Sequence, residues 1–202
     1  SVAPDPTAQF SCTHTRAQVR ASTPPTFIHE LQHMISYHQR VLVRNGRSEV
    51  TWLNEGLSHI AEEMGSRYYE DKNPAPAGRT NASQLFPDSS QGFITPNFRN
   101  AYSYLLDPTS HSVTTFEGLG TLEERGAAWL FLRWLGDQKG NGIYRSLVQT
   151  TRSGIDNVAN VAGEPFPALF GAFGIATYTD SIDGVARTSV PTRYRFTSRN
   201  TR

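Results

Sequence analysis

Residues 23–65, which decide the fold, read TPPTFIHELQHMISYHQRVLVRNGRSEVTWLNEGLSHIAEEMG. Apolar side chains recur at intervals of three and four on both sides of Asn45-Gly46, a pair typical of a helix that ends with a left-handed residue. This pattern predicts one helix over Thr23–Arg44, with Thr23 as its N-cap and a proline in its first turn. A second helix is predicted over Thr51–Tyr68, with Thr51 as its cap.

The first predicted helix carries two histidines at a spacing suited to a metal ion. His29 and His33 are four residues apart in HELQH, which places their β-carbons about 5–6 Å apart on one helix face. A catalytic zinc site usually has three protein ligands and leaves the fourth position to water. Glu55, in the second helix, is the expected third ligand. Two surface histidines on a solvated helix would give the same pentapeptide. The interpretation as a metal site therefore also depends on the sequence around Glu55.

Glu30 stands beside the first histidine and is the expected general base. A carboxylate at this position can take a proton from a water molecule and pass it to a leaving amine. Zinc lowers the pKa of a bound water from above 15 to about 7 in favourable sites. The residues therefore predict Zn2+ as the cofactor and metal-assisted hydrolysis of a peptide bond as the reaction.

The two motifs together resemble a known family. His29-Glu30-x-x-His33, followed by WLNEG at residues 52–56, is similar to the gluzincin clan of zinc metallopeptidases. The fuller strings most resemble the hyicolysin-type bacterial peptidases within that clan. The resemblance implies a zincin-like pair of catalytic helices and zinc bound by the two histidines and Glu55. It also implies a polypeptide substrate and a protein that is secreted or held in the cell envelope.

Residues near the expected ligands exclude one class of zinc peptidase and indicate a carboxylate that orients a ligand histidine. Ser36 and Gln39 stand where a metzincin would carry glycine and histidine, so that class is excluded. Some gluzincins carry an aspartate one turn beyond the third ligand, where it orients a ligand histidine, but this chain has His59 there. Glu62, two turns beyond the third ligand, is therefore the expected supporting carboxylate. A solvated helix face is the alternative for Glu62 and its neighbour Glu63.

The donor to the oxyanion that forms during peptide hydrolysis has several candidates. Such a donor often contributes a hundredfold or more in rate. In one gluzincin branch a Tyr-x-Lys-Gly string opens a core helix, and EERG at residues 123–126 resembles that string with the tyrosine missing. Arg125 is one candidate donor, and Tyr102, Tyr104 and His111 are the others.

Length and composition place the chain among globular proteins. Its 202 residues suffice for one domain with a core, and 37% hydrophobic with 18% charged residues fits neither a disordered nor a membrane-spanning chain. No apolar run is long enough for a bilayer-spanning helix. The net charge of +1 argues against a nucleic-acid surface built on bulk charge, and the single cysteine, Cys12, excludes an internal disulfide.

The rest of the chain predicts further helices, so the expected fold is mainly α, with a C-terminal helical bundle and little or no β-sheet. Residues 1–22 are expected to form an irregular lead-in with one turn of helix around Ala17–Ala21, and residues 23–202 a single helical domain. Additional helices are expected at 97–107, from a capping box at Thr121 to a break at 140–142, and at 143–150, 155–161 and 166–178. The tail at 190–202 is expected to be a lone strand or an extended segment.

Gluzincins usually carry, before the metal-binding helix, a β-sheet whose edge strand holds the substrate. Only 28 residues precede His29, and none of them forms a strand-like series. We therefore expect the chain to be the C-terminal part of a longer protein, with an upstream portion as its partner. The expected function is that of a zinc endopeptidase, and the intact Glu30 favours it. The alternatives are a gluzincin-like binding or structural domain that retains the metal site without catalysis, and a zinc hydrolase of another amide.

Overall fold

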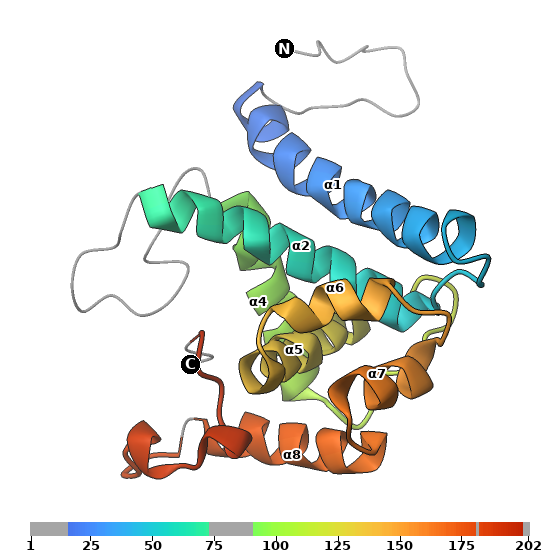
Figure 1. The fold of residues 1–202 in the computed structure, drawn as a ribbon. Helices are drawn as coiled ribbons and strands as arrows, with labels where there is room; N and C mark the ends of the chain where they lie inside the picture. The colour runs from blue at the N-terminus through green and yellow to red at the C-terminus, as the bar shows by residue number, and fades with distance from the viewer. Residues whose placement is uncertain (1–15, 73–90, 181, 200–202) are drawn as a thin grey trace.

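The computed structural model describes residues 16–72, 91–180 and 182–199 (Figure 1). All regular elements in these ranges are helical, which confirms the prediction of a mainly α fold. In chain order they are α1 (Arg16–Tyr37), the π-helix η1 (His38–Leu42), α2 (Thr51–Lys72), α4 (Gln91–Leu106), α5 (Leu122–Lys139), α6 (Gly142–Val148), α7 (Gly154–Ala162), α8 (Phe166–Thr179), and the short 3-10 helices η2 (Arg187–Ser189) and η3 (Thr192–Tyr194). Within this described part, no helix has the length and apolar character needed to cross a bilayer.

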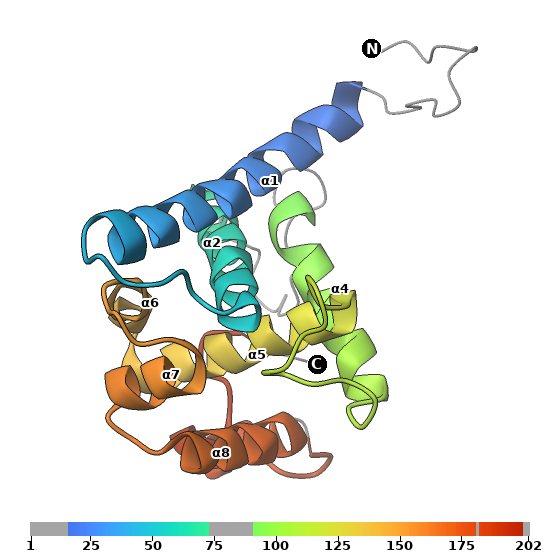
Figure 2. The ribbon, with the colours of Figure 1, turned by 90° about the vertical axis from the view of Figure 1, so that its right-hand side faces the viewer.

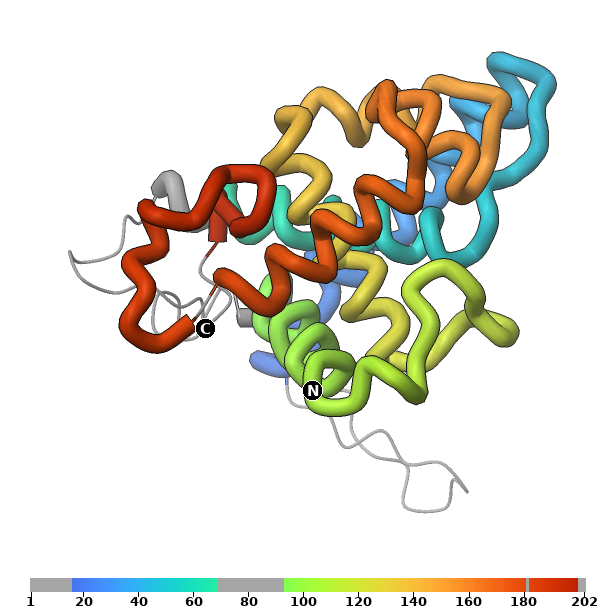
Figure 3. The backbone as a smooth tube through the Cα atoms, turned by 90° about the horizontal axis from the view of Figure 1, so that it is seen from below, coloured from blue at the N-terminus to red at the C-terminus, as the bar shows by residue number. Residues whose placement is uncertain are grey.

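Helix α5 is the centre of the fold. Every residue from Gly126 to Gly136 is buried, including two tryptophans. α5 packs against α2, α4 and α8, while α1 packs on α2. The order from top to bottom in Figures 1 and 2 is therefore α1, α2, α5 and α8. In the view from below, α8 lies in front of α5 (Figure 3).

An aromatic cluster joins α2, α5 and α8. The ring of Phe131, on α5, lies 5.4 Å from the ring of Phe173 and 5.6 Å from that of Phe166, both on α8. Trp52, in the first turn of α2, lies 6.3 Å from Phe131. Aromatic pairs at these separations add to the stabilisation from burial. The start of α2 is thereby fixed against α5 just before the residue expected to bind metal.

The capping box at the start of α5 is confirmed. Thr121 Oγ1 accepts a hydrogen bond from the Glu124 amide at 3.2 Å, and Glu124 Oε2 accepts one from the Thr121 amide at 2.8 Å. These bonds satisfy two amides that a helix start otherwise leaves without partners. α5 then runs to Lys139 and ends at Gly140, as the glycine-rich break predicts. The most buried helix thus has its start and end determined by local sequence.

The start of α1 differs from the prediction. α1 begins at Arg16 and runs through Pro24 and Pro25. Thr23 is not an N-cap, because its hydroxyl donates to the carbonyl of Val19 at 2.7 Å inside the helix. Each proline lacks an amide N–H, so the carbonyl four residues before it has no helical hydrogen-bond donor. Those carbonyls belong to exposed residues, where water can act as the donor instead. The helical turn expected around residues 17–21 of the lead-in is thus part of α1, which makes residues 16–22 helical throughout, while residues 1–15 lie outside the described ranges.

Other boundaries shift by smaller amounts. The helix predicted to end at Arg44 passes at residue 38 into η1, and Asn45 adopts the expected positive φ of 51°. α4 begins six residues before its predicted start and includes Pro96, while α6, α7 and α8 lie within two residues of their predicted bounds. The tail predicted as a strand or extended segment contains η3 instead, and residues 200–202 lie outside the described ranges.

The connection between η1 and α2 is anchored by a buried ion pair. Arg40 is fully buried, and its Nη1 lies 3.1 Å from Glu49 Oε2. Glu49 Oε1 accepts a hydrogen bond of 2.7 Å from the amide of Gly154, and Oε2 accepts one of 2.8 Å from Asn157 Nδ2. Both of these donors lie on α7. The segment between the two expected metal-binding helices is therefore held by the C-terminal half of the fold.

Candidate metal centre

The structure brings the three predicted ligands together between α1 and α2. Glu55 Oε2 lies 3.4 Å from His29 Nε2, and Glu55 Oε1 lies 3.5 Å from His33 Nε2. One donor atom from each of the three residues lies within 4.8 Å of the others. The two imidazole rings are 4.9 Å apart and nearly perpendicular, as expected for residues one turn apart on one helix face.

Local packing explains how Glu55 reaches this position. The residue after it, Gly56, faces α5, where an added Cβ would lie 2.8 Å from Leu132 Cδ1 and 3.3 Å from Ala128 Cβ. An added side chain at this position would require the Leu132 side chain to shift, so glycine favours the close approach of α2 to α5. Ser58, one turn further, places its Oγ 3.2 Å from His33 Nδ1 and donates to Gln32 Oε1 at 2.7 Å. The Asn-Glu-Gly string thus combines a ligand with a close helix contact.

The donor set and its burial fit a zinc ion. Two imidazole nitrogens and one carboxylate oxygen are the donor types found in catalytic zinc sites. The side chains of His29, His33 and Glu55 are 13%, 23% and 9% exposed, respectively. Glu55 Oε2 is buried and lies 3.4 Å from His29 Nε2 and 3.2 Å from Arg125 Nη1, while Oε1 lies 3.5 Å from His33 Nε2. The carboxylate thus faces two imidazole nitrogens, as a third zinc ligand would, and also the guanidinium of Arg125.

Glu62 supports the first ligand, as the sequence predicts. Its Oε1 accepts a hydrogen bond of 2.8 Å from His29 Nδ1, on the side of the ring opposite Nε2. Ligand histidines commonly donate their second ring N–H to a carboxylate in this way. Glu62 is 9% exposed and Glu63 is 1% exposed, so the alternative of a solvated helix face is wrong for both residues. Glu63 instead accepts hydrogen bonds from Trp129 Nε1 at 3.1 Å and Arg199 Nε at 3.0 Å.

The charges in the site shift the pKa values of its groups strongly. Burial alone would lower the pKa of His29, but hydrogen bonds to the carboxylates of Glu55 and Glu62 raise that pKa to about 9. Burial would raise the pKa of Glu62, but hydrogen bonds from His29 and His59 hold it at about 2. In Glu55 burial is likewise outweighed, by His29 and by the positive charge of Arg125, and its pKa lies below the ordinary value. Without a metal ion, a cation on His29 therefore balances the carboxylates.

Glu30, the expected general base, is exposed on α1. It follows His29 directly, so it projects about 100° around the helix from that ligand. An exposed carboxylate next to the ligands is accessible to water and to an incoming substrate. Its role as the general base stays a prediction.

The four candidate oxyanion donors occupy different places. Arg125 Nη1 lies 3.2 Å from Glu55 Oε2, and Arg125 Nε donates to the carbonyl of Leu119 at 3.0 Å. Tyr102 is 64% exposed on α4. Tyr104 and His111 line a separate hollow next to Phe170. Arg125 is therefore the candidate for which the structure gives a contact with the ligand set.

Two residues of the centre were missed in the sequence. His59 Nδ1 lies 3.0 Å from Glu62 Oε2, and Asn97 Nδ2 donates to the same oxygen at 3.0 Å. The spacing of three residues between His59 and Glu62 is a helical contact distance and could have indicated the first pair. Asn97 lies on α4, 35 residues after Glu62, and no local pattern links it to the site.

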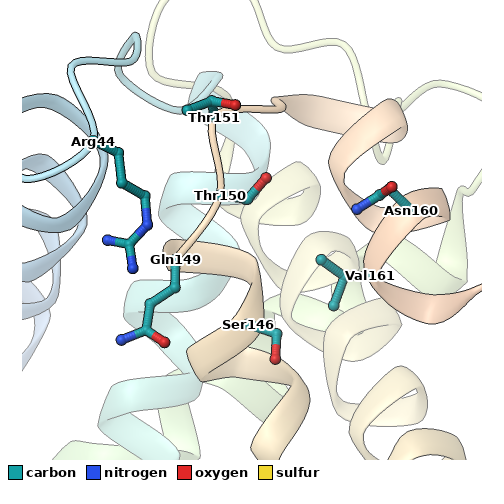
Figure 4. A pocket seen from close by; sticks show the side chains of 7 residues that line it. All are labelled: Arg44, Ser146, Gln149, Thr150, Thr151, Asn160 and Val161. Atoms are coloured by element: carbon teal, nitrogen blue, oxygen red, sulfur yellow. The ribbon is translucent and has the colours of Figure 1, made fainter.

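The fold also has a polar hollow that shares no lining residue with this centre. It has a volume of about 500 Å3 and lies between the end of the η1 segment, α6 and α7 (Figure 4). Arg44 reaches into it, and its Nη1 donates to Gln39 Oε1 at 2.8 Å. The other lining residues are Ser146, Gln149, Thr150, Thr151, Asn160 and Val161. None of these is a typical ligand of a transition metal.

Comparisons with protein-family models, with curated proteins and with solved structures give no match to this chain. The resemblance to gluzincins therefore rests on the two sequence motifs alone.

Proposed function

We propose that this protein is a zinc-dependent endopeptidase. The observation that carries the proposal is the convergence of His29, His33 and Glu55, from two helices, with donor atoms within 4.8 Å of one another. The exposed Glu30 beside His29 and the carboxylate of Glu62 on the far side of the His29 ring support it further. Together these residues supply ligands, a base and a support for one ligand.

Each residue has a distinct role in this proposal. His29, His33 and Glu55 would hold Zn2+, which when bound supplies a Lewis acid that lowers the pKa of water towards neutrality. Glu30 takes a proton from the attacking water and returns it to the amine that leaves. Glu62 keeps the His29 proton on Nδ1, so that Nε2 faces Glu55. Arg125, next to Glu55, is the candidate donor to the oxyanion.

The second candidate is a domain that retains the metal site but does not cleave peptides. The missing tyrosine at the start of α5 favours it, as does the use of two Arg125 nitrogens in contacts with Glu55 and Leu119. If Arg125 serves only to hold Glu55, the oxyanion has no identified donor. The two candidates agree on metal binding and differ on turnover.

Metal analysis and a cleavage assay of the same preparation distinguish the candidates. The endopeptidase is expected to contain about one zinc per chain and to cleave casein or a quenched peptide in a chelator-sensitive manner. Glu30→Gln should retain zinc and lose cleavage, whereas Glu117→Gln, a change at another exposed glutamate, should leave both unchanged. One zinc per chain without cleavage would support the second candidate. Absence of zinc from protein never exposed to chelator would contradict both.

A further inference from the structure

Glu62 is shared between two imidazoles. Its Oε1 lies 2.8 Å from His29 Nδ1, and its Oε2 lies 3.0 Å from His59 Nδ1. The rings of His29 and His59 are 5.0 Å apart at an angle of 70°. Glu62 therefore connects a proposed zinc ligand to a histidine outside the ligand set. His59 is 8% exposed and stands one turn after Glu55 on the same helix.

A third group from another helix fixes the same carboxylate. Asn97, on α4, is 1% exposed, and its Nδ2 donates to Glu62 Oε2 at 3.0 Å. The same nitrogen lies 3.3 Å from the carbonyl of His59 and 3.3 Å from that of Phe93. These bonds fix the amide in one orientation, with its nitrogen towards Glu62. Both carboxylate oxygens thus have donors, and those donors come from α1, α2 and α4.

The contacts around Glu62 are those of hydrogen bonds rather than of a second metal site. His29, His59 and Glu62 also offer three donor atoms within 4.8 Å of one another. However, each Nδ1 lies at hydrogen-bond distance from its own carboxylate oxygen, which requires a proton on that nitrogen. His59 Nε2 is buried and has no hydrogen-bond partner. Both imidazoles therefore carry a proton on Nδ1, where each faces its own oxygen of Glu62.

We infer that His59 and Asn97 are positioning residues of the metal centre. They hold Glu62 in place, and Glu62 in turn keeps the His29 proton on Nδ1 and directs Nε2 towards Glu55. Neither residue binds metal or touches substrate. This inference rests on the proposed metal site. It assigns to this chain a hydrogen-bond network that runs from Asn97 on α4 through Glu62 to His29 and lies outside the ligand set.

Zinc affinity of the folded chain tests the inference. His59→Leu and Asn97→Leu should each weaken zinc binding about 10- to 100-fold, because loss of such outer partners has effects of this size. His59→Asn should bind within about threefold of the wild type, because the asparagine Nδ2 can replace His59 Nδ1 as donor to Glu62. The measurement is competition against a chromogenic zinc chelator at a fixed pH, and a cobalt(II) absorption spectrum checks the ligand geometry.

Asp180, directly after α8, provides a buried polar control. It is 5% exposed, and its Oδ1 accepts hydrogen bonds from Arg187 Nε at 3.2 Å and from the Phe196 amide at 3.2 Å, away from the metal centre. Asp180→Leu should lower the free energy of unfolding but leave zinc affinity unchanged. If Asn97→Leu and His59→Leu also bind zinc as the wild type does, the inference is wrong and the proposed function stands. A wild-type protein that binds no zinc overturns both.

A measurement on the unmodified protein covers the case in which the variants do not fold. Long-range 1H–15N spectra of the zinc-loaded wild type at pH 8 report which ring nitrogen of each histidine carries the proton. His29 and His59 should both be protonated on Nδ1. Protonation of His59 on Nε2, or binding of two zinc ions per chain, would overturn the inference.

Discussion

The guanidinium of Arg125 lies 3.2 Å from Glu55 Oε2, so a residue of the central helix α5 contacts the carboxylate that α2 contributes to the metal centre. An arginine in this position can hold the ligand and also donate to charge that develops on a substrate. Gly126, the next residue, permits the close packing of α5 on α4, because an added Cβ would lie 2.3 Å from backbone atoms of α4.

Replacement of Arg125 separates these two uses. Arg125→Met should reduce kcat about a hundredfold, because loss of one oxyanion donor typically has an effect of that order. Zinc content should stay near one per chain, since the three ligands remain. Arg145→Met, at an exposed arginine on α6, is the control. Wild-type cleavage by the Arg125 variant would assign the residue to structure alone.

Removal of the metal should destabilise the protein. At a free zinc concentration about a thousandfold above Kd, bound zinc adds about 4 kcal/mol to the free energy of unfolding. For a chain of this size that corresponds to roughly 10 °C in Tm. Calorimetry with and without chelator measures the difference, which His33→Ala should abolish. His38→Ala, a change at an exposed histidine outside the ligand set, should keep the full zinc-dependent shift.

Zinc binding should release a proton at neutral pH. The pKa of His29 lies at about 9 without metal, whereas a ligand imidazole must offer a free Nε2. Affinity should therefore rise with pH up to about 9, by about tenfold per pH unit if one proton is displaced. Titration calorimetry in two buffers of different ionisation enthalpy counts the protons. Equal heats in both buffers would contradict this linkage.

The metal-free protein should be most stable in mildly acidic solution. Glu62 has an ordinary pKa of 4.5 and a folded pKa of about 2, so its contribution is present above pH 4.5 and is lost as pH falls towards 2. His29 has an ordinary pKa of 6.5 and a folded pKa of about 9, so its contribution is present below pH 6.5 and is lost as pH rises through 9. Urea unfolding at pH 3, 5.5 and 9.5 measures the loss of unfolding free energy on the acid side and on the alkaline side. Glu62→Gln should reduce the loss between pH 5.5 and pH 3. If that loss is unchanged in the variant, another carboxylate is responsible for it.

Gly56→Ala should disturb the centre through packing. Its Cβ would lie 2.8 Å from Leu132 Cδ1, and overpacking of this kind typically costs about 1–3 kcal/mol. Zinc affinity should fall as well, because the shift of α2 moves Glu55. Gly171→Ala on α8, where an added Cβ meets no atom within 4 Å, should stabilise the protein by about 1 kcal/mol. Urea unfolding of both variants provides the comparison, and equal stabilities would contradict it.

Local sequence predicts much of this structure because many of its determinants are local. Thr121 and Glu124 form their capping box within four residues, and His29 and His33 share a helix face through spacing alone. The place of Glu55 could be predicted because the motif resembles one whose geometry is known. In each case the information lies within one helix or within one recognisable string.

The features missed depend on tertiary packing. Thr23 and Pro24 predict a helix start, but α1 continues through Pro24 and Pro25 because the carbonyls that lose their donors belong to exposed residues. Asn97 was placed at the start of a helix, but α4 begins earlier, so that this residue faces Glu62 from a full turn inside the helix. The contact of Arg125 with Glu55 likewise arises only when α5 packs against α2.

The buried pair of Arg40 and Glu49 makes the metal centre inseparable from the rest of the molecule. A peptide limited to residues 16–72 would contain all three proposed ligands, yet it would lack the α7 amide and asparagine that hold the turn between the two helices. Transplanting the two motifs alone into another protein should therefore fail to reproduce the site, and insertions into α7 should act on the centre from a distance.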